Sequence, residues 1–341
     1  MLLLCPTFTV CFLAPSDAPT ILRQTASIFR QGYELSGLNY LEACTIGLVQ
    51  GVTELFPISS LGHSILLPAF IGGSWKADLD MTAKDSPYLA FLVLAHVATA
   101  LALVAFFWRD WVRIIRALFT SIRHRSVEGP DERLAWLLVI GTIPVGLIGI
   151  VADKALRTHL GKPVPAAAFL LINGFVIFLA DAMLKSSSKG RHADDGNVPP
   201  RRGEPPEVAA DRRLARLGWK SAAGIGGAQA FALLPGISRS GITMVAGLAR
   251  GLKTEDAARF AFLLATPVIL AAGVYKAPEL AKPANHSILG PAIAGSVLAG
   301  IAAYISVRFL TKYFENRSLR PFGVYCVIAG AISLVWFTVH H

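Results

Sequence analysis

Two polar clusters interrupt long apolar stretches of the 341-residue chain, and both contain side chains that could do chemistry. The first cluster reads QGVTELFPISSLGH and runs from Gln50 to His63. Its carboxylate, Glu54, would be costly inside a bilayer unless it is paired, faces a watery cavity or holds a cation. Gln50 lies four residues before Glu54, so on a helix the amide can hydrogen-bond the carboxylate. A structural hydrogen bond between helices is the alternative for either residue alone.

Pro57 breaks the first cluster, and two serines and a histidine follow it. A backbone break in an apolar segment exposes free N–H groups at the start of the next helix, which favours anion binding. Ser60 and His63 are three residues apart, within reach of each other, and both are candidate nucleophiles. Ser59 could contact the anion or only cap the helix. The sequence therefore predicts an anion pocket with a nucleophile.

The second cluster, QAFALLPGISRSG, begins at Gln229 and is broken by Pro235. It places Arg239 in an apolar stretch, and phosphate is the natural bidentate partner of a guanidinium at membrane depth. A buried ion pair between Arg239 and Glu54 is the alternative, and it is compatible with a functional role in the unliganded state. The hydroxyl groups near Arg239 belong to Ser238, Ser240 and Thr243.

Together the clusters supply a carboxylate, a histidine, serines, an arginine and two helix N-termini, and phosphoryl transfer needs little else. The arginine and the amides stabilise charge on the phosphoryl group, a nucleophile attacks in line, and an acid or base handles protons. The chain has neither a Walker loop nor a dinucleotide fingerprint. His96 and Asn173 are single polar residues in apolar stretches, and we interpret them as packing contacts.

The composition places these clusters in a membrane protein, because 54% of the residues are hydrophobic and only 16% are charged. The net charge of +10 comes from lysines and arginines between the apolar runs, which indicates membrane topology and not nucleic-acid binding. Windows long and apolar enough to span a bilayer lie at roughly 86–107, 134–152, 164–184, 259–277, 286–307 and 322–340.

The positive charges also predict the orientation of the chain. The basic segments 109–125, 185–216 and 308–320 are expected on the cytoplasmic side. The same counting leaves the loop near residues 73–85 and both termini outside.

The chain is predicted to contain one integral membrane domain, residues 37–340. Residues 1–36 are interpreted as a peripheral N-terminal extension, with a cleaved signal peptide as the alternative. Residues 185–215 are rich in Ser, Pro, Gly and charge and are predicted to form a flexible cytoplasmic linker between two halves.

The two clusters resemble each other, since each has Gln, an apolar turn, Pro, then Ser, and Gly three residues after that Ser. Segments 38–72 and 219–252 are too interrupted to be ordinary spans and are predicted to be re-entrant hairpins entering from opposite faces. The predicted fold is an all-α polytopic membrane protein with about six transmembrane helices and two broken-helix hairpins. The hairpins belong to an inverted repeat, about 38–184 and about 219–340, with chance similarity of short motifs as the alternative.

The motifs Q-x-x-x-E in the first cluster and PGISRSGIT in the second resemble the signatures of bacterial undecaprenyl-diphosphate phosphatases, the bacitracin-resistance proteins. The resemblance covers roughly residues 38–340. It implies hydrolysis of undecaprenyl diphosphate to the monophosphate and inorganic phosphate, which recycles the lipid carrier for peptidoglycan synthesis. The implied location is the bacterial inner membrane, with the active site opening to the periplasmic or outer face.

Carried over by position, the resemblance implies a catalytic set of Glu54, Ser60, His63 and Arg239. Ser60 or His63 would be the nucleophile, and Glu54 would orient or deprotonate water or hold a divalent cation, Mg²⁺ or Ca²⁺. The supporting or phosphate-contacting positions are Gln50, Ser59, Ser238, Ser240 and Thr243.

Two positions depart from the family pattern. Leu61 stands where the family usually has Thr, which removes one hydroxyl, and Gln50 stands where it usually has Glu, an accepted variant.

The partners that follow are a polyprenyl diphosphate lipid and the bilayer, with a homodimer left open and no nucleic acid. A secondary transporter or flippase for an anionic lipid phosphate is the rival function, because inverted repeats with broken helices are common in transporters.

Overall fold

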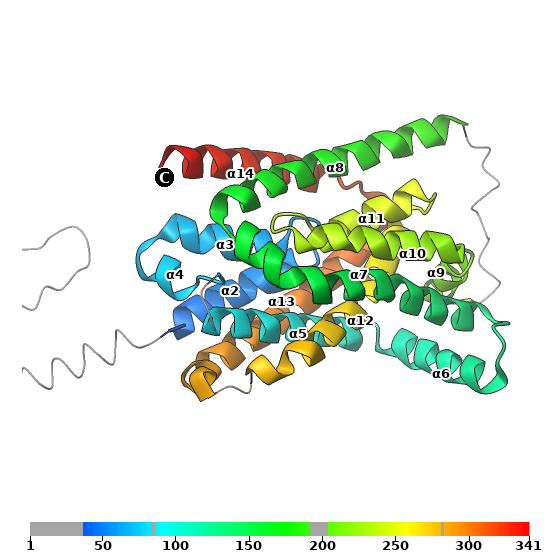
Figure 1. Cartoon of the computed structure of the whole chain (residues 1–341). Coiled ribbons are helices and arrows are strands. Elements are labelled where there is room, and N and C mark those ends of the chain that lie inside the picture. The colour runs from blue at the N-terminus through cyan, green and yellow to red at the C-terminus, as the bar shows by residue number, and fades with distance from the viewer. Residues whose placement is uncertain (1–36, 83–85, 191–203, 281–282, 341) are drawn as a thin grey trace, which may run out of the picture. The chain divides into compact units, whose positions relative to one another are not determined.

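The computed structural model describes residues 37–82, 86–190, 204–280 and 283–340. In these ranges the chain is built from helices, most of which run lengthwise beside one another (Figure 1). The helices are α2 (Tyr40–Thr53), α3 (Ser60–Ile71), α4 (Gly73–Asp78), α5 (Pro87–Phe106), α6 (Trp108–His124), α7 (Pro130–Leu160), α8 (Pro163–Gly190), α9 (Pro206–Leu214), α10 (Trp219–Ala228), η1 (Gln229–Leu233), α11 (Arg239–Ala249), α12 (Thr254–Leu280), η2 (Pro283–Ile288), α13 (Leu289–Asn316) and α14 (Arg320–Val339).

Six of the described helices contain segments long and apolar enough to cross a membrane, and each coincides with a predicted window. The spans lie in α5, α7, α8, α12, α13 and α14, and α5, α7, α8 and α14 begin with Pro at or next to the first helical position. Proline suits that position because the N–H it lacks would have no partner inside the helix. The prediction of an all-helical, multi-pass membrane protein is confirmed.

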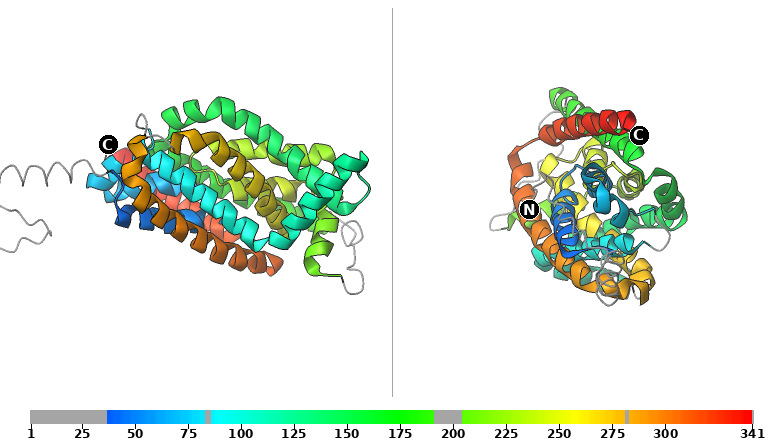
Figure 2. Two further views of the ribbon diagram at one scale, coloured as in Figure 1. Left: turned by 90° about the horizontal axis from the view of Figure 1, so that it is seen from below. Right: turned by 90° about the vertical axis from the view of Figure 1, so that its left-hand side faces the viewer.

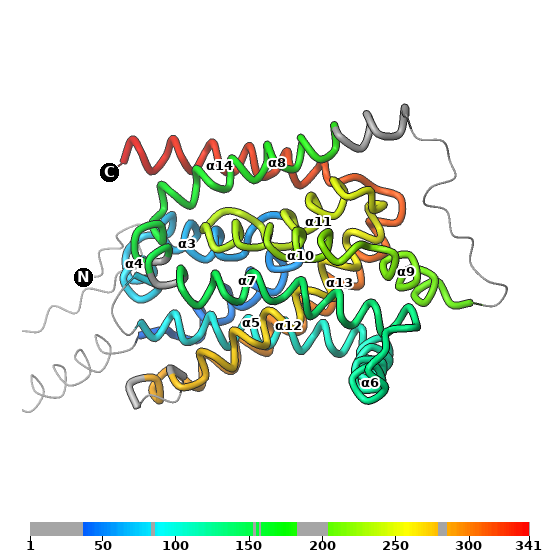
Figure 3. The backbone as a smooth tube through the Cα atoms, turned by 45° about the vertical axis from the view of Figure 1, so that its right-hand side comes forward, coloured from blue at the N-terminus to red at the C-terminus, as the bar shows by residue number. Residues whose placement is uncertain are grey.

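The two interrupted segments form helical hairpins. In the first, α2 and α3 meet at a break and pack against each other, and in the second, α10 and η1 lead to a break before α11. Each hairpin returns to the end from which it entered, and the two enter from opposite ends (Figures 1 and 3). The end-on view shows α3 among the longer helices (Figure 2).

Close glycine contacts fix both hairpins to the long helices. A Cβ on Gly47 of α2 would lie 2.0 Å from the carbonyl oxygen of Gly295 in α13. A Cβ on Gly226 of α10 would lie 1.9 Å from that of Gly141 in α7. Both hairpin glycines precede a glutamine by three residues, Gln50 or Gln229. The matched contacts support a repeat, whose inverted relation stays a prediction.

The predicted linker 185–215 is partly structured. Helix α8 continues to Gly190, and α9 occupies the last third of the predicted linker. Asp211 of α9 is fully buried. Its carboxylate is stabilised there by the guanidinium of Arg259 in α12, at 2.7 and 3.1 Å, and by a contact with Arg113. Composition alone does not reveal such long-range ion pairs. Residues 191–203 and the predicted extension 1–36 lie outside the described residues.

Candidate active site

Both hairpin breaks end in a serine that caps the next helix. The Oγ of Ser59 accepts a hydrogen bond from the N–H of Gly62 at 3.2 Å, and the Oγ of Ser238 accepts one from Gly241 at 3.1 Å. Ser59 has a φ of 69°, a left-handed conformation that is strained for a residue other than glycine. The alternative of a capping role for Ser59 is thus confirmed, and the strain suits a site held rigid by its surroundings.

The two breaks lie against each other. The Ser59 Oγ also accepts a hydrogen bond from the N–H of Gly236 in the second hairpin at 3.2 Å. The backbones pack tightly here, because a Cβ on Gly62 would lie 3.0 Å from the Gly236 Cα and would require the second hairpin to shift slightly. Ser240 closes the contact by donating to the Phe56 carbonyl at 3.1 Å. The Ser-x-x-Gly pattern shared by the clusters therefore lies at the contact between the two hairpins.

Asn173 of α8 joins both breaks. Its Nδ2 donates to the Pro57 carbonyl and its Oδ1 accepts from the Ser238 N–H, each at 3.0 Å. The side chain is buried, and it satisfies one orphan group of each break. Asn173 was expected to be a packing contact, and the structure corrects this to a bridge between the two hairpins.

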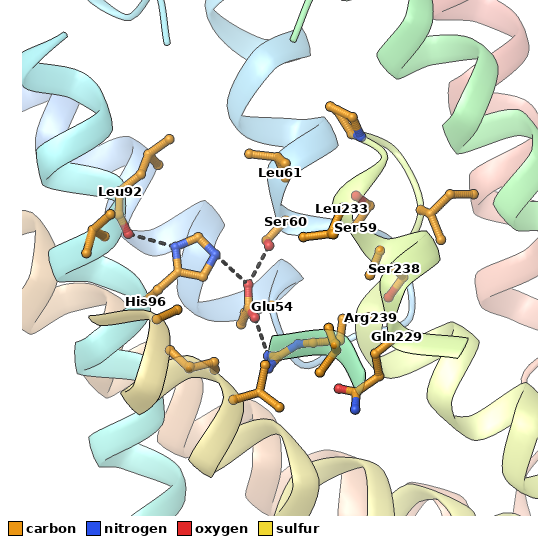
Figure 4. Close-up of a pocket in the computed structure, with 18 of the residues that line it drawn as sticks. Glu54, Ser59, Ser60, Leu61, Leu92, His96, Gln229, Leu233, Ser238 and Arg239 are labelled. Carbon is orange, nitrogen blue, oxygen red and sulfur yellow. Dashed lines mark hydrogen bonds and ion pairs between the residues drawn. The ribbon is translucent and has the colours of Figure 1, made fainter. Parts of the chain in front are cut away.

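Glu54, at the end of α2, receives hydrogen bonds or ion pairs from residues of four helices, α2, α3, α5 and α11. Gln50 Nε2 donates to Oε2 at 2.9 Å, and the Ser60 hydroxyl donates to the same oxygen. The guanidinium of Arg239 binds Oε1 at 2.5 Å, and Nε2 of His96 lies 3.2 Å from Oε2 (Figure 4). The predicted pairs of Glu54 with Gln50 and with Arg239 are both present.

Arg239 is the first residue of α11, directly after the second break. Its Nη1 donates to the Ala265 carbonyl of α12 at 3.1 Å, which fixes the guanidinium while Nη2 binds Glu54. The guanidinium, whose side chain is 15% exposed, and the N-terminus of α11 together favour an anion. The ion pair is the form expected without a ligand, since a phosphate can replace the carboxylate on the arginine.

His96 of α5 belongs to this cluster although it was expected only to pack. Its Nδ1 lies 2.7 Å from the Leu92 carbonyl while Nε2 faces Glu54. A ring that contacts oxygen acceptors through both nitrogens is best satisfied by the doubly protonated imidazolium. The one signal in the sequence was an ionisable residue in the middle of a span, which is a functional candidate by default.

A cavity of about 270 Å³ adjoins the cluster. Its polar lining comes from Glu54, Ser59, Ser60, His96, Gln229, Ser238, Arg239 and Lys276. The rest is apolar and includes Met81, Leu89, Leu92, Val145, Val268 and Ile269. A small polar region inside mainly apolar walls suits an amphiphile with an anionic head.

Four of the predicted residues are not among the described side chains that line the cavity: Gln50, His63, Ser240 and Thr243. The ring of His63 turns to Tyr325, with Nε2 2.7 Å from the hydroxyl and Nδ1 2.7 Å from the Ser59 carbonyl. Thr243 donates to the Arg239 carbonyl at 2.7 Å, and Gln50 reaches the site only through Glu54. The structure thus brings Glu54, Ser60 and Arg239 together, without His63.

The residues around Glu54 do not fit a cation held by the protein alone. The described residues contain no group of three or more His, Cys, Asp or Glu side chains that could hold a metal ion. Gln50, Ser60 and Arg239 all present donors to the carboxylate, whereas a divalent cation requires oxygen acceptors. The surroundings of Glu54 therefore do not favour a cation at this carboxylate.

The fold and the site define a class: multi-pass membrane proteins whose two broken helices meet at a cluster of polar side chains around a buried carboxylate. The chain belongs to the bacitracin resistance protein BacA family, whose sequence model matches residues 43–332.

Several relatives carry the name undecaprenyl-diphosphatase. One from Mycolicibacterium paratuberculosis (strain ATCC BAA-968 / K-10) is 56% identical over 302 residues, covering 89% of this chain and 98% of that protein. Undecaprenyl-diphosphatase 1 of Frankia casuarinae is 45% identical, covering 89% and 100% of the two chains. Undecaprenyl-diphosphatase 1 of Burkholderia pseudomallei (strain K96243) is 42% identical, covering 86% and 96%.

Proposed function

We propose that this protein hydrolyses undecaprenyl diphosphate to undecaprenyl phosphate and inorganic phosphate. The relatives with this name match nearly their whole length, so the activity is expected to reside in the shared domain. The observation that carries the proposal is the ion pair between Arg239 and Glu54 at the cavity, 2.5 Å long, which a substrate phosphate can open. The activity recycles a lipid carrier for peptidoglycan synthesis and accounts for bacitracin resistance.

Ser60 is the better nucleophile candidate on geometry, because its hydroxyl donates to Glu54 and lines the cavity. In the proposed step the Ser60 oxygen attacks the terminal phosphorus and its proton passes to Glu54. The bond from that phosphorus to the bridging oxygen breaks, and undecaprenyl phosphate leaves. Water then hydrolyses the phosphoserine. Arg239 and the first amides of α11 stabilise the charge on the transferred phosphoryl group.

His63 would act instead only after a change of rotamer, because its nitrogens now bind Ser59 and Tyr325. The remaining proposed roles are indirect. Gln50 orients Glu54, and Thr243 supports the first turn of α11. Ser59, Ser238 and Ser240 hold the two breaks together around the phosphate site.

A divalent cation, Mg²⁺ or Ca²⁺, stays a prediction of the sequence, and no step of the proposed reaction depends on it. The sequence leaves a homodimer open. We also propose that the protein lies in the bacterial inner membrane, with the cavity opening to the outer face. The basic segments between spans support this orientation. A transporter of lipid phosphate is not favoured, since it would not need a hydroxyl bound to a buried carboxylate.

The test is phosphate release from a polyprenyl diphosphate by the purified protein in detergent. The wild-type protein is expected to release phosphate, and Arg239→Ala and Glu54→Ala to lose nearly all activity while remaining folded. Full activity in both variants would overturn the proposed site, and no release by the wild-type protein would overturn the function.

A further inference from the structure

Gln229 is a buried amide without a partner. The residue is 1% exposed and lines the cavity, and neither its Nε2 nor its Oε1 has a hydrogen-bond partner in the part of the chain that the structure describes. Native proteins satisfy most buried polar side chains, because leaving them unpaired destabilises the fold. An unpaired amide beside a binding cavity therefore calls for an explanation.

In the equivalent glutamine of the first hairpin the Nε2 has a partner, and only the Oε1 has none among the described residues. Gln50 donates to Glu54, four residues later, at 2.9 Å. Four residues after Gln229 stands Leu233, whose aliphatic side chain offers no acceptor. The two halves thus hold a glutamine in matching places, but only the first half supplies its own carboxylate. In the second half the hydrogen-bonding capacity of the amide remains available to a molecule in the cavity.

The position of Gln229 relative to the other site residues indicates which part of a substrate it would meet. In the view of Figure 4, Ser60 and Gln229 lie on opposite sides of the Arg239 side chain. In phosphoryl transfer the attacking and leaving oxygens lie roughly in line across the transferred phosphorus. With Ser60 attacking a phosphate bound to Arg239, the leaving group lies on the side of Gln229.

We propose that Gln229 forms a second phosphate subsite, in which its Nε2 donates to an oxygen of the phosphate that stays esterified to the lipid. This inference rests on the proposed function, because it assigns the two phosphates of the diphosphate to two places. Arg239 and the start of α11 bind the terminal phosphate, and Gln229 binds the leaving one. A site built to hydrogen-bond its substrate leaves such a group unpaired when empty.

The variant that tests the subsite is Gln229→Leu, which keeps the approximate volume and removes both polar atoms. Loss of one hydrogen bond to a charged phosphate is expected to raise the KM for polyprenyl diphosphate about 10- to 100-fold. The value of kcat should change much less. Inhibition by undecaprenyl phosphate should weaken by a similar factor, whereas inhibition by inorganic phosphate, which occupies the Arg239 subsite, should not change.

Thermal melts in detergent separate binding from a structural role. Removing an unpaired buried amide is expected to leave the melting temperature of the empty protein unchanged or higher. Added undecaprenyl phosphate should raise the melting temperature of the wild-type protein more than that of Gln229→Leu. The matched control is Ser296→Ala. It also removes a buried polar group without a described partner, in this case a hydroxyl in a groove between α5 and α13. It should alter neither KM nor the ligand-induced shift.

The inference is overturned if Gln229→Leu keeps the wild-type KM and product inhibition, or if it only lowers the melting temperature. Failure of the proposed function is a separate result, namely no phosphate release by the wild-type protein. The melts with undecaprenyl phosphate still test the subsite in that case, because they need no turnover.

Discussion

The guanidinium of Arg239 and the carboxylate of Glu54 meet at 2.5 Å, although the residues are 185 positions apart in the chain. The pair connects the two hairpins at the cavity. Removing one member of a buried ion pair leaves the other charge unpaired, whereas replacing both can be neutral. We expect Glu54→Leu alone to lower the free energy of unfolding by about 3 kcal/mol and the double variant Glu54→Leu/Arg239→Met to recover most of this.

Phosphate release should not recover together with stability in the double variant. Both variants are expected to lack phosphate release, because the double variant has lost the anion site as well as the carboxylate. Thermal melts and phosphate assays on the same preparations check both points. A double variant as unstable as Glu54→Leu would show that the pair does not couple the hairpins.

Ser60 and His63 differ in the phosphoenzyme that each would form. We expect a phosphoenzyme that survives acid, as phosphoserine does, because Ser60 lines the cavity and His63 turns to Tyr325. Acid quenching after brief mixing with labelled substrate measures it, with Ser60→Ala as the negative control. Label that is lost in acid and persists in Ser60→Ala would instead identify His63.

His96 is expected to contribute to catalysis through its contact with Glu54 at 3.2 Å. We predict that His96→Leu lowers kcat about 100-fold, the scale of a lost acid–base group, and that His96→Gln retains more because an amide still donates. The His96 variants should also alter the pH dependence of kcat, because they remove an ionisable group in contact with Glu54. His63→Gln is the matched control and should keep the pH dependence of the wild-type protein.

The spans and the hairpin breaks were predictable because their signals are local. A run of about 20 apolar residues has few alternatives to a membrane helix, and Pro57 lacks the N–H that a continuing helix would use. The set of Glu54, Ser60 and Arg239 was also predictable, since charge and hydroxyls are rare in such segments. The parts of the site that could not be predicted from the sequence depend on contacts between distant segments. His96 and Asn173 look like isolated polar residues until folding brings α5 and α8 to the breaks.

Helix α9, on the predicted cytoplasmic side, could not be predicted from the sequence for the same reason. Its charged composition predicted a linker, but Asp211 binds Arg259 through two hydrogen bonds. We expect Asp211→Ala to lower the free energy of unfolding by about 3 kcal/mol, because it leaves a buried arginine with fewer partners. Glu255→Ala is the control, as this carboxylate is 42% exposed and 3.4 Å from Arg213, and it should cost less than about 1 kcal/mol. Equal losses in thermal melts would contradict a docked α9.

The side-chain amide of Asn173 satisfies both the Pro57 carbonyl and the Ser238 N–H, each at 3.0 Å. Asn173→Leu leaves both backbone groups buried without that partner, at about 1–3 kcal/mol each. Since these groups fix the two breaks beside Glu54 and Arg239, kcat should fall together with stability. The control is Ile177→Val on the same helix, which should cost about 1 kcal/mol and leave kcat unchanged. If Asn173→Leu loses stability but keeps the wild-type kcat, the bridge supports the fold without positioning the site.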